Sequence, residues 1–279
     1  MLFAIALINA LASVAFMIVS SFYENGIPVF IQMFITGLLA YIVPICVYAK
    51  VTGMTSKEAS ERFYLKKSKT HYIVLAALLG IGCQFIAVVL NLPMNMLFKN
   101  YDSYTASSIS ELVLAIVVVG VLPALFEEFL FRGIVLGSMS EINAKAAIIF
   151  SSVMFAILHA DICGFLGYLF MGFTLSVVTR RTESVLAAVV FHFMNNVTAL
   201  LLGYFNPIFM YEPKILIALF AGGVLLFAVV AILFVKITKR QDEAKRIPTG
   251  RLLAQNFVSV PIILTIVVTA FAGLVIRIV

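Results

Sequence analysis

Long apolar segments, separated by short polar connections, follow one another along almost the whole chain. Several of them reach or approach the roughly 20 residues that a helix needs to cross a bilayer. They are too apolar and too continuous for the alternating strands of a membrane barrel. The pattern therefore predicts an all-α, polytopic transmembrane bundle of about eight or nine helices. We expect the membrane helices near residues 3–22, 27–49, 72–92, 108–137, 145–160, 164–179, 184–205, 213–235 and 253–277.

The composition supports a single integral-membrane domain over residues 1–279. Of these residues, 63% are hydrophobic and 11% are charged, which is too little polar surface to cover a water-soluble core of this size. No internal repeat and no long linker divides the chain. The first apolar segment has neither a basic leading region nor a convincing cleavage site, so we expect it to be retained as a membrane helix.

Basic residues gather on alternate connections, as expected when these connections stay on the cytoplasmic side of a membrane. The predicted orientation has a cytoplasmic N-terminus and an external C-terminus. The net charge of +6 favours contact with anionic lipid headgroups, and the sequence has no nucleic-acid motif. The lack of an organelle signal favours the plasma membrane of a prokaryote. The basic clusters are Lys50, Lys57, Arg62, Lys66, Lys67 and Lys69, then Lys145, then Arg180 and Arg181, then Lys236, Lys239, Arg240, Lys245, Arg246 and Arg251.

Two adjacent glutamates, Glu127 and Glu128, interrupt one of the most apolar stretches of the chain. Burying each charge in a bilayer costs roughly 2.5 kcal/mol or more unless a partner or cavity water compensates it. Arg132 lies four residues after Glu128, so the two side chains share a helical face and can pair. Glu127 would project about 100° away from Glu128, in a different direction. A carboxylate in apolar surroundings binds a proton more tightly than in water, which suits a general base.

Two histidines lie on neighbouring predicted helices. His159 ends an apolar run that includes Phe155, and His192 shares a helical face with Asn196 four residues later. A histidine and an amide side chain aimed at one point can donate hydrogen bonds to a carbonyl oxygen as it becomes an oxyanion. Together with Glu127, these groups would form a hydrolytic site in a polar cavity within the membrane.

Each polar group also has a purely structural explanation. A single intramembrane histidine often serves as a hydrogen-bonding residue between helices, and Asn195 and Asn196 could do the same. A glutamate and arginine pair could be a structural clamp or part of an ion pathway. Two of the three histidines lie in segments that neighbour the paired acids, and this convergence favours a catalytic site.

Three short motifs stand in order on successive predicted helices, namely Glu127-Glu128-x-x-x-Arg132, Phe155-x-x-x-His159 and His192-x-x-x-Asn196. Together they resemble the motifs of the CPBP family. This is the CAAX protease and bacteriocin-processing group, also called the Abi family, of intramembrane glutamic endopeptidases. The resemblance covers roughly residues 108–205, which we expect to be the catalytic core. Each motif alone is weak, whereas all three in order within a membrane protein are specific.

The resemblance implies a role for each matching residue. Glu127 would activate the attacking water, and His159 would assist it and help to hold the water. His192 and Asn196 would bind the oxyanion. The supporting residues would be Glu128, Arg132 and Asn195. This mechanism needs no cofactor and no metal.

Two other functions remain open. The same glutamate and histidines could ligate zinc and activate water through the metal, although the chain has no HExxH signature and Asn196 would be a poor zinc ligand. Alternatively, the chain could be a non-catalytic membrane adaptor or a bacteriocin-immunity-type protein that binds a peptide or sensor partner. For an enzyme, the resemblance implies a membrane-associated or lipidated peptide as substrate. The sequence indicates neither whether that peptide is prenylated nor any oligomeric state.

Overall fold

The computed structural model describes residues 55–98, 106–206, 213–238, 249–257 and 262–267, together with positions 35, 50, 53, 259 and 269. Most of these residues are helical, and no β-strand occurs among them, which confirms the predicted all-α class. The predicted helix at 3–22, all of the one at 27–49 except position 35, and about half of the one at 253–277 lie outside the described residues.

The expected helices between residues 72 and 235 are all present, with somewhat different ends. They are α5 (Thr70–Phe98), a continuous helix over Ile109–Ser140, α9 (Ala144–Leu158), α10 (Phe165–Thr182), α11 (Val185–Tyr204) and α13 (Pro213–Ile237). Two shorter helices are α4 (Ser56–Arg62) and α14 (Thr249–Phe257), and residues 262–267 are helical as well.

Four of the described helices are long and apolar enough to cross a membrane. They are Thr70–Phe98, Ile109–Ser140, Val185–Tyr204 and Lys214–Ile237. Helix α9 has only 15 residues, and α10 carries Arg180 and Arg181 in its last turn. The structure thus agrees with a polytopic membrane bundle, while the polar cavity within it stays a prediction.

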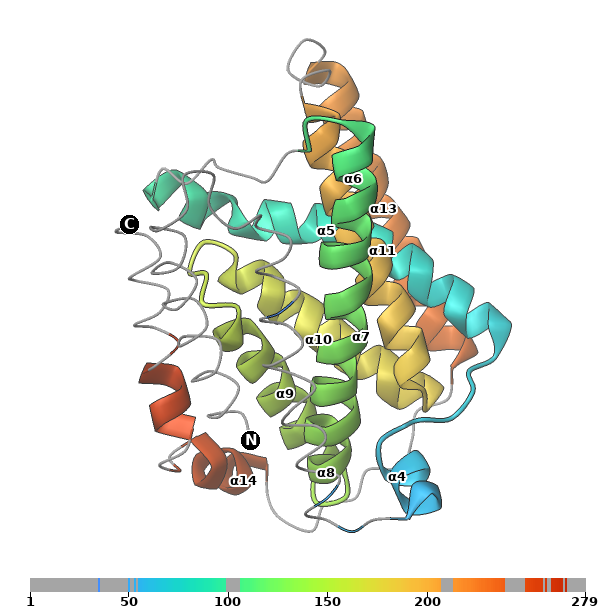
Figure 1. The fold of residues 1–279 in the computed structure, drawn as a ribbon, viewed down its shortest axis with the longest axis vertical. Coiled ribbons are helices and arrows are strands. Elements are labelled where there is room, and N and C mark those ends of the chain that lie inside the picture. Colours follow the sequence, from blue (N-terminus) through green and yellow to red (C-terminus); the bar gives the residue numbers. More distant parts are fainter. Residues whose placement is uncertain are drawn as a thin grey trace.

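The core lies where five helices meet. Figure 1 shows the long helix over Ile109–Ser140 beside α9 and α10, with α5 crossing the bundle. Helix α5 packs against α10, α11 and α13, and α9 packs against α10. Each of the five helices around the core contributes a large, almost fully buried apolar side chain. These are Leu79, Phe131, Phe155, Leu175 and Phe191.

Polar residues fix the starts of two helices that position the site. The side chain of Ser108 accepts a hydrogen bond from the backbone N–H of Glu111, at the start of Ile109–Ser140. The side chain of Asn143 does the same for Ala146, at the start of α9. Such caps satisfy backbone donors that have no partner within the helix.

The helix over Ile109–Ser140 contains two π-helical segments. Its parts are α6 (Ile109–Ala115), the π-helical segment η2 (Ile116–Val121), α7 (Leu122–Glu128), the π-helical segment η3 (Phe129–Val135) and α8 (Leu136–Ser140). The two glutamates therefore lie at the end of a short α-helical piece between two π-helical ones. Such segments are rare and occur frequently at functional sites.

Neighbouring helices contribute a side-chain hydrogen bond to each π-helical segment. Pro123 has no backbone N–H, so it cannot donate to the Val119 carbonyl as residue 123 would in a regular α-helix. The amide nitrogen of Asn196 on α11 donates to that carbonyl instead, at 3.0 Å. In η3, the Phe131 carbonyl accepts from the hydroxyl of Ser151 on α9, at 3.1 Å. These two bonds flank the turn that carries the glutamates.

Candidate active site

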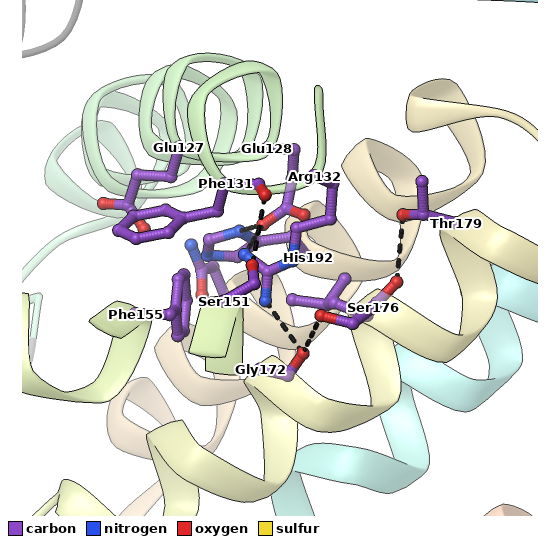
Figure 2. A network of polar contacts seen from close by, with 12 residues as sticks. Glu127, Glu128, Phe131, Arg132, Ser151, Phe155, Gly172, Ser176, Thr179 and His192 are labelled. Carbon is purple, nitrogen blue, oxygen red and sulfur yellow. Dashed lines mark hydrogen bonds and ion pairs between the residues drawn. The ribbon is translucent and has the colours of Figure 1, made fainter. Parts of the chain in front are cut away.

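Glu128 lies at the centre of a buried polar network (Figure 2). Its Oε1 accepts a hydrogen bond from Nη1 of Arg132 at 3.1 Å and lies 2.8 Å from Nδ1 of His192. The side chains of Glu128 and Arg132 are fully buried, and that of His192 is 2% exposed. The expected pair of Glu128 with Arg132 is thus present. The bond to His192, 64 residues further along the chain, is a contact that sequence reasoning missed.

Arg132 extends the network to two further helices. Its Nη2 donates to the Gly172 carbonyl of α10 at 3.1 Å, and its guanidinium carbon lies 4.4 Å from the ring centre of Phe155 on α9. A Cβ atom at position 172 would lie 3.1 Å from Cα of Ser152, so the missing side chain lets α10 approach α9 closely. A carboxylate, a carbonyl and an aromatic face therefore surround the buried positive charge.

Glu127 points away from this network, as Figure 2 shows. Its Oε2 lies 3.8 Å from Nε2 of His159, which follows the last residue of α9. The side chains are 10% and 20% exposed, respectively, so this side of the site is less tightly enclosed than the Glu128 side. The distance is too long for a direct hydrogen bond. A single water molecule can bridge it, with bonds of about 2.8 Å to both atoms.

The backbone of α9 determines which nitrogen of His159 faces Glu127. Nδ1 lies 2.7 Å from the Phe155 carbonyl, and a carbonyl oxygen only accepts hydrogen bonds. Nδ1 therefore carries a proton. In the neutral ring, Nε2 is then the acceptor, and it is directed towards Glu127.

The two asparagines lie one turn further along α11 than His192. The amide nitrogen of Asn196 donates to the Val119 carbonyl, so one of its two N–H groups contacts the helix that carries Glu127. Asn195 is 5% exposed. The structure thus brings Glu127 together with His159 and Glu128 with Arg132 and His192, and it anchors Asn196 to η2.

Three residues of the site gave no signal in the sequence. Gly172 contributes a backbone carbonyl, Ser151 holds the Phe131 carbonyl, and Tyr168 stacks on His159 with 3.9 Å between the ring centres. In the sequence, each looks like an ordinary residue of an apolar helix. Only the packing of α9 and α10 brings them to the glutamate pair.

In the described part of the chain, no group of three His, Cys, Asp or Glu side chains could hold a metal ion together. Glu127 and His159 supply two donors, whereas catalytic zinc sites have three protein ligands. The ring nitrogen Nδ1 of His192 is engaged with Glu128.

Comparison with known proteins gives one family and one relative. Residues 109–198, about a third of the chain, match the family "Type II CAAX prenyl endopeptidase Rce1-like". The Bacillus subtilis (strain 168) protein named "Putative membrane peptidase YdiL" is 37% identical over 84 residues. The aligned part spans 30% of this chain and 34% of that relative. No solved structure matches the chain. The matched segment contains all three motifs, and the predicted resemblance to CAAX proteases is confirmed.

Proposed function

We propose that this chain, an integral membrane protein with an Rce1-like CAAX endopeptidase segment over residues 109–198, hydrolyses peptide bonds with glutamate-activated water. The position of Glu127 carries the proposal. Its carboxylate faces His159 across 3.8 Å, whereas Glu128 bonds to Arg132 and His192. One acid thus lies at a gap that suits a water molecule, and its neighbour anchors the surrounding helices.

The first step is attack by water. A water molecule between Oε2 of Glu127 and Nε2 of His159 donates one hydrogen to each, because both atoms are acceptors. Its lone pairs then point away from both residues, towards a substrate carbonyl. As the new carbon–oxygen bond forms, one water proton moves to Glu127, which acts as the general base. No side chain becomes covalently attached to the substrate.

His192 and Asn196 bind the resulting oxyanion. Nδ1 of His192 faces Glu128, so Nε2 is left for the substrate, and it donates only when the ring is protonated on both nitrogens. In that form Nδ1 donates to the Glu128 carboxylate. Asn196 donates one amide hydrogen to Val119 and has a second one for the substrate oxygen.

The tetrahedral intermediate collapses when its carbon–nitrogen bond breaks. Glu127 returns its proton to the leaving nitrogen, which becomes the new amino terminus. One water molecule is consumed and the carboxylate is restored, so the residues end the cycle in their starting state.

The substrate class we propose is a membrane-associated peptide with a prenylated cysteine. The family description names a prenyl endopeptidase. In addition, Glu127 belongs to a helix that is long and apolar enough to cross a membrane, which suits a substrate delivered from the bilayer. We place the protein in the plasma membrane of a prokaryote, and the bacterial relative supports this location.

Cleavage of a quenched-fluorescent peptide with a farnesylated cysteine and three following residues tests the proposal. The full chain in liposomes is compared with Glu127→Gln and with Glu61→Gln, a matched control because Glu61 is exposed on α4. Loss of the general base should lower turnover about 10²–10⁴-fold, and the control should cleave like the wild type. Full cleavage by Glu127→Gln would refute the assignment.

Two further measurements address the alternative functions. Cleavage that stops with a chelator and returns with added zinc would favour the metalloprotease. If cells that express Glu127→Gln at the wild-type level keep every function of the wild-type chain, a membrane adaptor or an immunity-type protein would be favoured.

A further inference from the structure

The chain reverses sharply between α9 and α10, directly after His159. Ala160 has a left-handed backbone with φ of 53°. The side chain of Asp161 accepts hydrogen bonds from the backbone N–H groups of Cys163 at 2.9 Å and Gly164 at 3.0 Å. These bonds fix the start of α10 relative to the end of α9. As a result Tyr168, in the first turn of α10, comes back over His159.

The imidazole of His159 lies against two aromatic rings. The Tyr168 ring stacks on it, with 3.9 Å between the centres and 24° between the planes. The Phe155 ring lies 4.5 Å away at a tilt of 56°. Nδ1 is also bound to the Phe155 carbonyl. Of these contacts, the stack with Tyr168 is the one that restrains the ring plane from outside α9.

Gly164 allows this stack to form. A Cβ atom at position 164 would collide with the Tyr168 ring and with the carboxylate of Asp161. Its φ of −86° is ordinary for any residue, so space and not backbone conformation requires glycine here. A larger residue at 164 would therefore displace both the Tyr168 ring and the Asp161 carboxylate.

We propose that Tyr168 is a positioning residue whose ring holds the His159 imidazole with Nε2 directed at Glu127. This inference rests on the proposed function for its effect on catalysis, and on the stacked geometry alone for its effect on His159. Misplacement of a catalytic group by about 1 Å can cost about a hundredfold in rate. The gap between Nε2 and Glu127 is 3.8 Å, so a small rotation of the ring would remove one of the two acceptors of the water.

Turnover of the farnesylated peptide by three variants tests the catalytic part. Tyr168→Leu should lower kcat about tenfold or more with little change in KM, because the ring orients the water and not the substrate. Tyr168→Phe should keep kcat near the wild-type value, since it keeps the stacked ring. Phe173→Leu is the matched control, because Phe173 is an exposed aromatic residue of the same helix. Equal kcat values for Tyr168→Leu and Phe173→Leu would overturn this part.

Nuclear magnetic resonance of histidine-labelled full-length protein tests the geometry without any substrate. The chain has three histidines, so a His159→Gln variant identifies the signal of His159. The stacked ring should shift this signal in the wild type and in Tyr168→Phe, and the part of the shift that comes from this ring should disappear in Tyr168→Leu, which keeps only the Phe155 ring beside His159. An unchanged His159 signal in Tyr168→Leu would overturn the proposal even if the peptide is not a substrate. Failure of the wild type to cleave the peptide, with these shifts intact, would count against the proposed function only.

A second pair of variants perturbs the stack without changing either ring. Gly164→Ala should move the His159 signal and lower kcat, because its Cβ displaces the Tyr168 ring. Gly222→Ala is the control, since nothing lies within 4 Å of an added Cβ there. A Gly164→Ala protein with the wild-type signal and the wild-type kcat would contradict the role of Tyr168.

Discussion

The Glu127 side and the Glu128 side of the site differ in how tightly the protein holds them. Glu128 is fully buried, and one of its oxygens contacts both Arg132 and His192 within 3.1 Å. Glu127 is the adjacent residue, yet its side chain is 10% exposed and its Oε2 lies 3.8 Å from Nε2 of His159. Two identical side chains on one turn thus have different surroundings because adjacent helical residues point in different directions.

This difference leads us to expect that one side of the site contributes mainly to stability and the other mainly to turnover. The contacts of Glu128 and Arg132 connect η3 with α10 and α11. Removing one partner of a buried ion pair leaves the other charge uncompensated, which strongly destabilises the fold. The Glu127 side leaves a distance that a small molecule can bridge. We therefore expect substitutions on the first side to change the free energy of unfolding most, and those on the second to change mainly turnover.

The largest expected loss of stability comes from Arg132→Met. The substitution leaves Glu128 as a buried charge without its cationic partner, which typically costs 3–5 kcal/mol of unfolding free energy. Denaturation of the full chain in detergent measures it, with Arg251→Met on the exposed face of α14 as control. Adding Glu128→Gln to Arg132→Met should recover part of the loss. Wild-type stability of Arg132→Met would contradict the idea that the Glu128 side stabilises the fold.

Phe155→Leu should have the next largest effect, and it should affect both sides of the site. The Phe155 ring contacts Arg132 at 4.4 Å and His159 at 4.5 Å, measured to its centre. Losing this ring should cost about 1–3 kcal/mol of unfolding free energy and should also lower kcat. The control Phe129→Leu removes an exposed ring from η3. A drop in kcat without any loss of stability would mean that only the contact of Phe155 with His159 matters, and not its contact with Arg132.

Ser151→Ala tests how much the hydrogen bond to the π-helical segment contributes. It removes the bond to the Phe131 carbonyl, and such a bond typically contributes about 1 kcal/mol. Thermal unfolding of the detergent-solubilised chain would detect the difference, with Ser60→Ala at a partly exposed position of α4 for comparison. Equal unfolding temperatures for the two variants would show that η3 does not depend on Ser151.

Glu127→Gln should change stability least, by less than about 1 kcal/mol, because glutamine keeps the shape and lacks only the charge. The same variant should lose turnover. Its effect on activity should therefore be large although its effect on stability is small. Its unfolding free energy is measured in the series that contains Arg132→Met. Destabilisation as large as that of Arg132→Met would mean that both glutamates are structural.

The helices of the bundle could be predicted because the thickness of the bilayer sets the length of an apolar segment. The residues at which these helices end were harder to predict. The predicted helix 72–92 stops one residue before Pro93, whereas α5 continues through this proline to Phe98, although proline disfavours a helix interior. The π-helical segments also gave no signal beyond Pro123, because they depend on side-chain donors from other helices.

The site shows the same limit. The pair of Glu128 with Arg132 could be predicted because both residues lie on one helix at a fixed spacing. The bond of His192 to Glu128 and the stack of Tyr168 on His159 could not, because each joins separate helices. Residue types and their order predicted the groups of the candidate site. The packing of α9, α10 and α11 decides which of them touch.

The position of Arg132 on the same helix as Glu128 also matters for insertion of this helix into the membrane. Arg132 reaches Glu128 from the same helix, so the two charges cancel as soon as that helix winds. Each charge alone would oppose transfer from the translocon into lipid by about 2.5–3.5 kcal/mol. The ribosome must still add 64 residues after Glu128 before His192 exists. The Glu128–Arg132 pair can therefore enter the bilayer as a locally neutral unit, ahead of the helices that later enclose it.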